Sequence, residues 1–296
     1  MTISEDAGTT ALTVVEQACR GFGLSARGAE PVRIAENQIW RLPGQVILRI
    51  ARPGQMASAK REVRVARWLA DQGVPAVRPL DVHQPIEVEG RPVTAWEELP
   101  SHQDGTATDV AHLLKQLHAL PTPEFHVGIL DPFVRLPERI ASATTLTSDD
   151  RAWLHSRLAE LKDTWSIRAA GLPHCLVHGD AWTGNVKLTA AGPVWLDLER
   201  FSIGTPEWDL TSTAAKLTTA GSVTAHEYAA FCAVYGADVT QSDDYPLFAA
   251  ARELRMATYA AQHAAAHPEW HAEAQHRVSC LRGRNGPRPW RWIGIV

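Results

Sequence analysis

The sequence predicts an α+β protein, with a small β-rich lobe at the N-terminus and a larger helical lobe after it. Between residues 32 and 98, runs of strand-forming residues alternate with turn dipeptides, and one amphipathic helix interrupts them. Beyond Pro100 the apolar residues recur at helical spacing instead. The chain has 296 residues, which is long for a single core and suits two lobes. We therefore expect an N-terminal lobe over residues 1–100 and a C-terminal lobe over residues 101–296.

The order of elements in the first lobe follows from local patterns. A helix is expected over residues 9–22, where apolar residues have helical spacing. The segments VRIAENQIWRL and QVILRIA flank a Pro-Gly turn dipeptide and predict a hairpin. Residues 58–72 predict an amphipathic helix, and further strands are expected at residues 78–83 and 92–98.

The second lobe is expected to be helical on either side of one polar loop. Residues 107–120 and 149–163 have clear helical patterns, and Thr147 with Asp150 resembles a capping box before the second helix. Residues 205–280 are rich in alanine and also predict helices. Between these regions the short apolar segments CLV and VWL surround the polar loop.

Charge and cysteine content narrow the classes of function. The formal net charge of -4 gives no basic surface, so neither a nucleic-acid partner nor a membrane partner is expected. The chain has no run of 18 apolar residues, and its polar start lacks the pattern of a secretory signal. The four cysteines lie far apart and form no CxxC pair. We expect a reduced, cytoplasmic protein, and the sequence leaves its oligomeric state open.

The segment from His174 to Leu210 is the most informative about chemistry. Asp180 is followed by four residues and then Asn185, and Asp197 ends a short apolar strand further along. Phosphoryl transfer requires an acceptor hydroxyl held in line and divalent cations that neutralise the developing charge. One Asp facing the hydroxyl, with an Asn and a second Asp at a metal, meets that requirement, because Mg²⁺ needs few protein carboxylates beside phosphate oxygens. The spacing therefore predicts a phosphotransferase site.

The same segment resembles a known family. HGDAWTGN, WLDLE and GTPEWDL are similar to the signature of aminoglycoside phosphotransferases and choline kinases, a group that shares the protein-kinase fold. ENQIWRL resembles the phosphate-covering hairpin of that family and GRPVTAWEELP its hinge, so the resemblance runs roughly from residue 30 to residue 255. It implies a bilobal protein-kinase-like fold, ATP or GTP as phosphoryl donor, and Mg²⁺ as cofactor.

The resemblance also implies roles for individual residues of the motif. Asp180 is the expected catalytic base, and His178 is the histidine expected to shape its loop. Asn185 and Asp197 are the expected metal ligands. Two further acids occupy family positions, Asp209 as a brace of the catalytic loop and Glu199 near a second metal.

The nucleotide is expected to contact the first lobe. Protein kinases hold the α- and β-phosphates with a strand lysine that pairs with a helix glutamate. Here the strand VILRI offers Arg49, with Glu62 as its partner. Arginine stays charged and can bind phosphate oxygens through two N–H groups, so the role is chemically retained; alternatively, Arg49 extends from an exposed strand face. Further contacts are expected from the covering hairpin and the hinge, through Asn37, Gln38, Glu98 and Leu99.

We predict a small-molecule kinase that transfers the γ-phosphoryl group of ATP or GTP to a hydroxyl of a small acceptor. The first acceptor class is an aminoglycoside-type or other antibiotic, which implies antibiotic resistance. A metabolic kinase for choline, homoserine or a sugar is an alternative, and a pseudokinase that binds nucleotide without turnover is an alternative of another class. A metal-dependent phosphoesterase would need more ligands than the motif offers. Acidic residues slightly favour a polycationic acceptor: Asp104, Glu227, Asp243, Asp244 and Glu253.

Three other features lie outside the motif's expected chemistry. Trp182 lies two residues after Asp180 in the expected catalytic loop. Its ring either forms the floor of the acceptor site or packs against the loop. His263, His267 and His271 have the spacing of zinc ligands on one helix face, but Pro268 interrupts that helix and favours a solvated surface. The tail RPWRWIGIV is expected to fold back on its own lobe.

Overall fold

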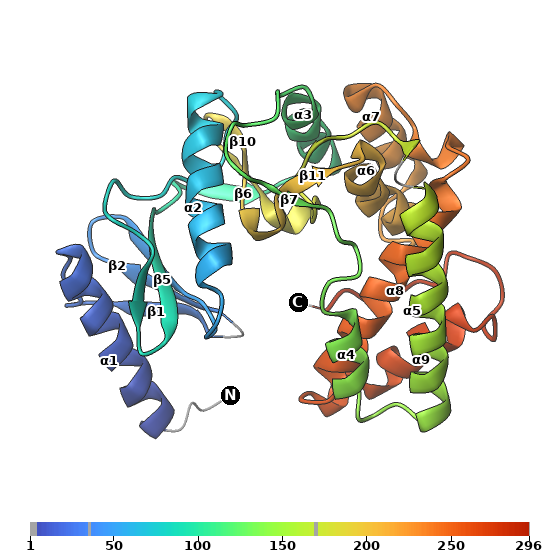
Figure 1. Ribbon diagram of the computed structural model, residues 1–296, viewed down its shortest axis with the longest axis horizontal. Helices are drawn as coiled ribbons and strands as arrows, with labels where there is room; N and C mark the ends of the chain where they lie inside the picture. Colours follow the sequence, from blue (N-terminus) through green and yellow to red (C-terminus); the bar gives the residue numbers. More distant parts are fainter. Residues whose placement is uncertain (1–4, 35–36, 169–170, 296) are drawn as a thin grey trace. The chain divides into compact units, whose positions relative to one another are not determined.

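The computed structural model describes residues 5–34, 37–168 and 171–295, with residues 5–11 described by their backbone alone. Strands dominate the N-terminal region and helices the C-terminal region, which confirms the predicted α+β class (Figure 1). The chain separates into two compact units. One comprises Met1–Gly105 with Gly184–Phe201, and the other comprises Thr106–Thr183 with Ser202–Val296.

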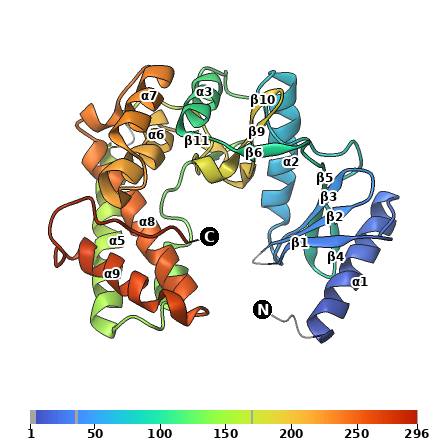
Figure 2. The same ribbon diagram turned by 180° about the vertical axis from the view of Figure 1, so that it is seen from behind.

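The first unit is built on a five-stranded antiparallel sheet in the order β1-β2-β3-β5-β4 (Figure 2). Its strands are β1 (Glu30–Ile34), β2 (Gln38–Leu42), β3 (Val46–Ile50), β4 (Ile86–Val88) and β5 (Arg91–Glu97). Along β3, buried side chains alternate with half-buried ones. Because successive side chains of a strand point to opposite faces, Arg49 lies on the face opposite Leu48 and Ile50.

Helix α1 (Glu5–Phe22) packs against the apolar face of this sheet. Val15, Ala18 and Phe22 of the helix share one core cluster with Leu48 and Ile50 of β3. Full burial of a valine, leucine or isoleucine side chain contributes about 1.5–3 kcal/mol. This cluster therefore fixes β3, and with it the position of Arg49.

Helix α2 (Met56–Asp71) packs against β5 and the 3-10 turn η3 (Leu198–Arg200). Its buried face is apolar except for one carboxylate, and consists of Ala59, Glu62, Val63, Val65, Ala66 and Leu69. Trp68 is half-buried, and its ring contacts that of Phe201 edge-on. A buried carboxylate is costly without a cationic partner, so Glu62 requires a partner from a neighbouring element.

Two strand predictions in this unit need correction. Residues 78–83 do not form a strand; Pro79 makes an isolated bridge to Trp96, and the strand that pairs beyond it is β4. Arg78 and Leu80 still form backbone hydrogen bonds with Glu97 and Ala95 of β5, at 2.8 and 2.9 Å, but Pro79 between them has no amide proton to donate. The segment expected as one strand from residue 32 to residue 42 forms two paired strands, β1 and β2, and residues 35 and 36 lie outside the described residues.

A second, three-stranded sheet of the first unit has the order β10-β9-β6. Its strands are β6 (His102–Asp104), β9 (Val186–Thr189) and β10 (Gly192–Trp195). The amide of Trp195 donates to the carbonyl of Pro75 at 3.0 Å, and the amide of Val77 donates back at 2.9 Å. These backbone bonds join residues 184–201 to the N-terminal chain, whereas the sequence assigned that segment to a C-terminal lobe beginning at residue 101.

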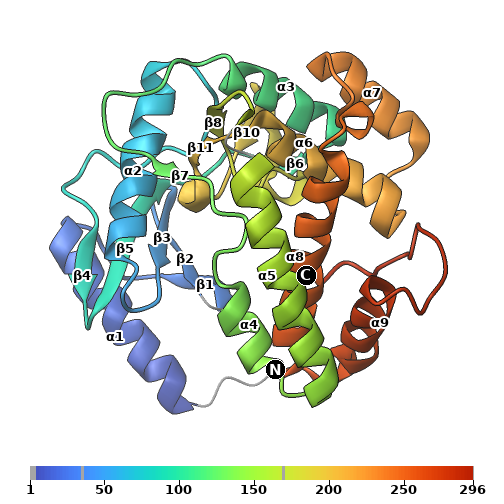
Figure 3. The same ribbon diagram turned by 45° about the vertical axis from the view of Figure 1, so that its right-hand side comes forward.

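The second unit is mainly helical, and Figure 3 shows α5 and α8 side by side. Its helices are α3 (Ala107–His118), α4 (Leu136–Ser142), α5 (Ser148–Arg168), α6 (Pro206–Ala215), α7 (Ala225–Tyr235), α8 (Tyr245–Ala264) and α9 (His271–Leu281). The helices predicted at 107–120 and 149–163 are confirmed, and Thr147 accepts a hydrogen bond from the amide of Asp150 at 3.1 Å. A small sheet consists of β7 (Gly128–Ile129), β11 (Ser202–Gly204) and β8 (Cys175–Val177), and β8 ends one residue before His178 of the HGD motif.

The C-terminal tail folds back on its own unit, as predicted. Trp292 is buried in a cluster with Ala220 and Cys280. Arg288 donates to both carboxylate oxygens of Glu253, at 2.7 and 2.8 Å. The tail thus caps the end of the helical unit through packing and charge together.

The histidines with zinc-like spacing do not form a metal site. His263 and His267 stack with ring centroids 4.1 Å apart, while Nε2 of His271 lies 2.9 Å from the carbonyl oxygen of Ala264. Across the described ranges, no group of three or more Asp, Glu, His or Cys residues converges as metal ligands. None of the helices in those ranges is long and apolar enough to cross a bilayer.

Candidate active site

The predicted site residues are distributed over both units, and each unit presents its own cluster. The first unit holds the expected nucleotide and metal contacts, namely Asn37, Gln38, Arg49, Glu62, Glu98, Leu99, Asn185 and Asp197. The second unit holds the expected catalytic residues His178 and Asp180.

In the first unit, Arg49 is the centre of a charged cluster. Its Nη1 donates to both carboxylate oxygens of Glu62 at 2.5 Å, and its Nη2 donates to Glu199 at 2.9 Å. Asp197 lies further away, with Oδ1 3.8 Å from Nη2. The guanidinium is largely buried, with 14% of its side chain exposed, so Arg49 does not extend from an exposed strand face.

Three carboxylates facing one guanidinium control the ionisation of the cluster. Burial opposes the charge of Arg49, but Glu62, Asp197 and Glu199 together outweigh that effect and raise the pKa of Arg49 above its usual value. Burial raises the pKa of Glu62 to about 7, against the attraction of Arg49 and with support from the two other acids. The cluster carries more negative than positive charge, which favours an added cation.

Asn185 and Asp197 lie at the same end of the β9–β10 hairpin. Asn185 directly precedes β9, and Leu196 alone separates the end of β10 from Asp197. The amide of Leu196 donates to the carbonyl of Asn185 at 2.9 Å and holds these two chain segments together. Asp197 has φ 51°, a left-handed conformation that costs energy for a residue other than glycine and is common at functional sites.

A small, open hollow lies beside Arg49 in the first unit. Its lining includes the charged residues Arg49, Arg52, Glu62 and Glu199, and the polar residues Asn37 and Ser58. Guanidinium, amide and hydroxyl groups are the donors that phosphate oxygens accept. Of the predicted contacts, Asn37 therefore lies with Arg49 at a place suited to phosphate.

Gln38, Glu98 and Leu99 do not line this hollow. Gln38 pairs with Ile50 across the β2–β3 ladder, and its side chain accepts from the indole of Trp40 at 3.3 Å. Glu98 follows β5, where its amide donates to Gln45 at 2.7 Å and its carboxylate accepts from Arg41 at 2.6 Å. Leu99 is the next residue of that connection and is half-buried.

In the second unit, the loop with His178 and Asp180, which is expected to be catalytic, is held by a buried carboxylate. Asp209 on α6 accepts hydrogen bonds from the backbone amides of His178 at 2.7 Å and Gly179 at 2.9 Å. His118 contacts the same carboxylate at 3.2 Å. Burial alone would raise the pKa of Asp209, but these partners outweigh it and hold the pKa below its usual value. Gly179 has φ 82°, which residues other than glycine rarely adopt, so the turn before Asp180 requires it.

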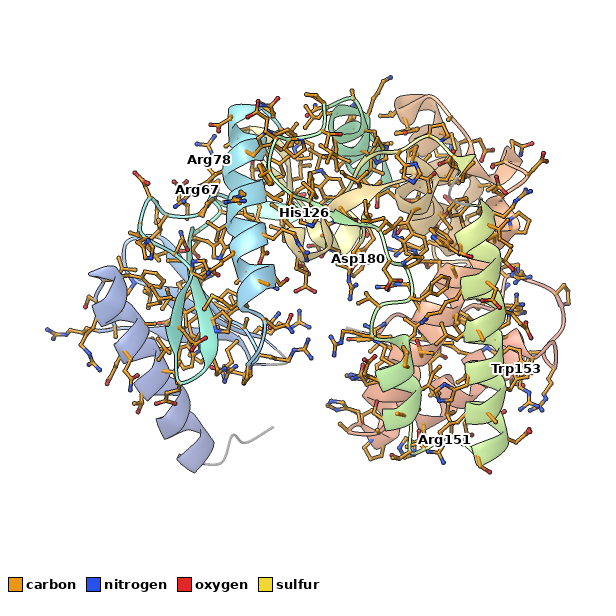
Figure 4. The ribbon with its side chains drawn as sticks, viewed as in Figure 1. Arg67, Arg78, His126, Arg151, Trp153 and Asp180 are labelled. Atoms are coloured by element: carbon orange, nitrogen blue, oxygen red, sulfur yellow. The ribbon has the colours of Figure 1, made fainter. Side chains whose placement is uncertain are left out.

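Asp180, labelled in Figure 4, directly follows this turn. Its carboxylate lies 3.4 Å from Nη1 of Arg252 on α8. The guanidinium of Arg252 sits 4.0 Å over the ring of Trp208 and donates to the backbone carbonyl of Trp208 at 3.1 Å. Sequence reasoning missed Arg252, although a charged residue on the buried face of an alanine-rich helix is a signal of such a contact.

The family follows from comparison of the whole chain with known proteins. Residues 29–254 match the sequence profile of the phosphotransferase enzyme family. The chain belongs to this family. That finding confirms the resemblance to aminoglycoside phosphotransferases and choline kinases. No curated protein matches this phosphotransferase at a significant level of sequence similarity.

Solved structures show that the phosphotransferase has a kinase-like fold. The amicoumacin kinase hAmiN is 14% identical with a TM-score of 0.66, and the match covers 90% of this chain and 95% of that one. Aminoglycoside phosphotransferase APH(3'')-Id of Streptomyces rimosus is 20% identical with a TM-score of 0.60, over 83% of this chain and 97% of that one. Choline kinase LicA of Streptococcus pneumoniae is 13% identical with a TM-score of 0.63, over 92% and 99%.

Four of the five acids that were expected to favour a polycationic acceptor are engaged in other contacts of this phosphotransferase. Asp104 belongs to the first unit and pairs with Lys187, and Asp244 pairs with Arg168 at 2.6 Å. Glu227 completes the N-terminal capping box of α7, and Glu253 binds the C-terminal tail. Asp243 is exposed. The charge argument for a polycationic acceptor therefore has no support in these contacts.

The brace on the catalytic loop leads to a stability prediction. Asp209→Asn should lower the free energy of unfolding by about 1.5–3 kcal/mol, because hydrogen bonds to a charged group are lost inside the core. The contribution of Asp209 is complete above about pH 4, the pKa of an unfolded aspartate, and is lost as the pH falls through its lower folded-state pKa. Urea denaturation between pH 3 and pH 7 measures both effects.

The matched control for this measurement is Asp163→Asn, because Asp163 is exposed on α5. That variant should unfold like the wild type at every pH. Equal stability of Asp209→Asn and wild type at pH 7 would show that Asp209 does not brace the loop.

Proposed function

We propose that this phosphotransferase transfers the γ-phosphoryl group of ATP or GTP to a hydroxyl of a small-molecule acceptor, with Mg²⁺ as cofactor. The observation that carries the proposal is the loop after β8, where Asp209 fixes the backbone of His178 and Gly179 so that Asp180 is presented at its end. The charged cluster around Arg49 supplies the groups that a nucleotide and its cation need.

Asp180 acts as the base or orienting group for the acceptor. Its carboxylate accepts the hydroxyl proton while the acceptor oxygen attacks the γ-phosphorus, and ADP or GDP leaves. His178 shapes the loop, because its side chain is fully buried and Nδ1 accepts from the amide of Asp180 at 3.3 Å. Arg252 keeps the carboxylate oriented through the contact at 3.4 Å.

In the first unit, Arg49 binds phosphate oxygens while Glu62 keeps its guanidinium in place. Asn185 and Asp197 hold Mg²⁺, since their oxygens lie on adjoining segments at one end of the hairpin and suit a hard cation. The bound ion would neutralise charge on the transferring phosphates. Asn37, Gln38, Glu98 and Leu99 complete the proposed nucleotide site in the hairpin and hinge.

The acceptor is proposed to be an antibiotic of aminoglycoside or other type, which would make the protein a cytoplasmic resistance enzyme. Structures with the same fold include a streptomycin complex of APH(3'')-Id and the amicoumacin kinase hAmiN. The likeness to choline kinase LicA favours the second candidate, a metabolic kinase for choline, homoserine or a sugar. A pseudokinase has no need for the braced Asp180 loop, which argues against that class.

A panel of acceptors tests the proposal directly. Purified protein with Mg·ATP or Mg·GTP is mixed with streptomycin, kanamycin, a macrolide, a peptide antibiotic, choline, homoserine and simple sugars, and ADP or GDP release is recorded. Acceptor-dependent release with one of them is the expected result. Nucleotide binding without release for any acceptor would support the pseudokinase.

The role of Asp180 leads to the first kinetic prediction. Asp180→Asn should lower kcat by roughly a hundred- to ten-thousand-fold, because a positioned base contributes about that factor. Nucleotide affinity should stay nearly unchanged. Asp243→Asn, an exposed change of the same type, is the control. If Asp180→Asn keeps more than about a tenth of the wild-type kcat, Asp180 is not the base.

The role of Asp197 leads to a prediction about metal dependence. Asp197→Asn keeps the size of the side chain and tolerates the left-handed backbone, but it removes the negative charge that would bind Mg²⁺. Calorimetric titration with AMP-PNP should show affinity that rises with Mg²⁺ in the wild type and hardly changes in the variant.

The control for this titration is the exposed Asp71 at the end of α2, changed to Asn. It should retain the wild-type response to Mg²⁺. A response of Asp197→Asn equal to that of the control would remove Asp197 from the metal site.

A further inference from the structure

Lys216 brings a second positive charge to the catalytic loop. It is the first residue of the π-helical turn η4 (Lys216–Ala220), which continues α6. Its Nζ lies 4.5 Å from the centre of the Trp182 ring and donates to Oγ1 of Thr183 at 3.2 Å. Both contacting residues belong to the HGDAWTGN loop, two and three residues after Asp180.

The surroundings of this ammonium are unusual for a structural lysine. Within the described ranges Lys216 forms no ion pair within 4.0 Å, so Thr183 and the indole ring are its main contacts. An ammonium has three donors, and Thr183 accepts from one of them. Burial lowers the pKa of Lys216 to about 8, and the charge of Asp180 opposes that shift. A partly desolvated cation with donors to spare is suited to bind an anion.

The local backbone supports a functional position as well. Single turns of π-helix are rare and occur frequently at functional sites. Here the π-helical turn starts at Lys216, the residue that contacts the catalytic loop. Trp182 is 40% exposed, and the ammonium of Lys216 lies over one face of its ring. The ring therefore makes a cation–π contact at the surface of the loop.

We propose that Lys216 is a further catalytic residue, whose ammonium donates to the phosphoryl group as that group arrives on the acceptor oxygen held by Asp180. The inference rests on the proposed function. The bond from the acceptor oxygen to the γ-phosphorus forms, and the bond from that phosphorus to the bridging oxygen breaks. The nucleoside diphosphate leaves with the bonding electron pair, the hydroxyl proton passes to Asp180, and Lys216 keeps its own proton.

Kinetics of two variants distinguish this role from simple packing against Trp182. Lys216→Met keeps the aliphatic stem over the indole and removes the charge, while Lys216→Arg keeps the charge. With Mg·ATP and the active acceptor of the panel above, Lys216→Met should lower kcat about ten- to hundredfold, as loss of a charge-assisted hydrogen bond does. Its KM for ATP and its melting temperature should stay close to wild type, and Lys216→Arg should recover part of the rate.

Lys115→Met provides the matched control, because the partner of Lys115 on α3 among the described residues is the backbone carbonyl of Val234, at 3.2 Å. This variant should keep the wild-type kcat. If Lys216→Met does not fold, Lys216→Gln replaces it, with circular dichroism to confirm folding. A wild-type kcat in a folded, neutral Lys216 variant overturns the role of Lys216 alone. A wild type that transfers no phosphoryl group to any acceptor overturns the proposed function, and the inference with it.

The pH profile gives a second readout that packing would not change. In the free enzyme, the charged group that affects the pKa of Lys216 is the carboxylate of Asp180 in the same loop. Because a neutral amine cannot stabilise the phosphoryl charge, wild-type kcat/KM for ATP should fall about tenfold per pH unit above pH 8. Arginine stays charged there, so Lys216→Arg should lose this decline. The same decline in both proteins would overturn the proposal.

Discussion

The buried ion pair between Arg49 and Glu62 is the interaction on which the first unit depends. Glu62 occupies the otherwise apolar face of α2, and only a cation of fixed geometry makes its burial affordable. Arg49 donates to both carboxylate oxygens of Glu62 through Nη1 and to Glu199 through Nη2. Sheet, helix and the β9–β10 hairpin are thus tied through one side chain, and the acids around it retain an excess of negative charge.

The second unit also depends on a buried charged group, here the carboxylate of Asp209. Asp209 is fully buried, and its carboxylate is satisfied by two backbone amides of the catalytic loop and by His118. The backbone amides of the turn after β8 are therefore satisfied, and Asp180 follows in a fixed loop. Arg252 and Lys216 add positive charge near Asp180, and in the proposed function these cations would face the phosphoryl oxygens.

The spacing of residues within one segment allowed much of this to be predicted. The HGD turn follows from a short motif and the Arg49–Glu62 pair from the protein-kinase pattern. The structure joins Asp180 to His178 and Arg49 to Glu62. The roles assigned to them stay predictions. The sequence pattern marks Arg252 as a charged residue on a buried helix face, but its partner Asp180 could not be predicted, because that contact depends on how α8 packs. The same holds for the β9–β10 hairpin, whose membership in the first unit depends on pairing with the distant strand β6.

Calorimetric titration of an Arg49 variant with Mg·AMP-PNP tests directly whether Arg49 holds the nucleotide. Arg49→Met with Glu62→Leu removes both members of the charged pair, so that neither is left unpaired in the core. We expect the affinity of the double variant to be lowered about ten- to hundredfold, and that of Arg49→Lys to be intermediate. Arg67→Met on α2 should keep wild-type affinity, because Arg67 binds the carbonyls of Leu80 and Val82. Wild-type affinity in the folded double variant would show that Arg49 does not bind the phosphates.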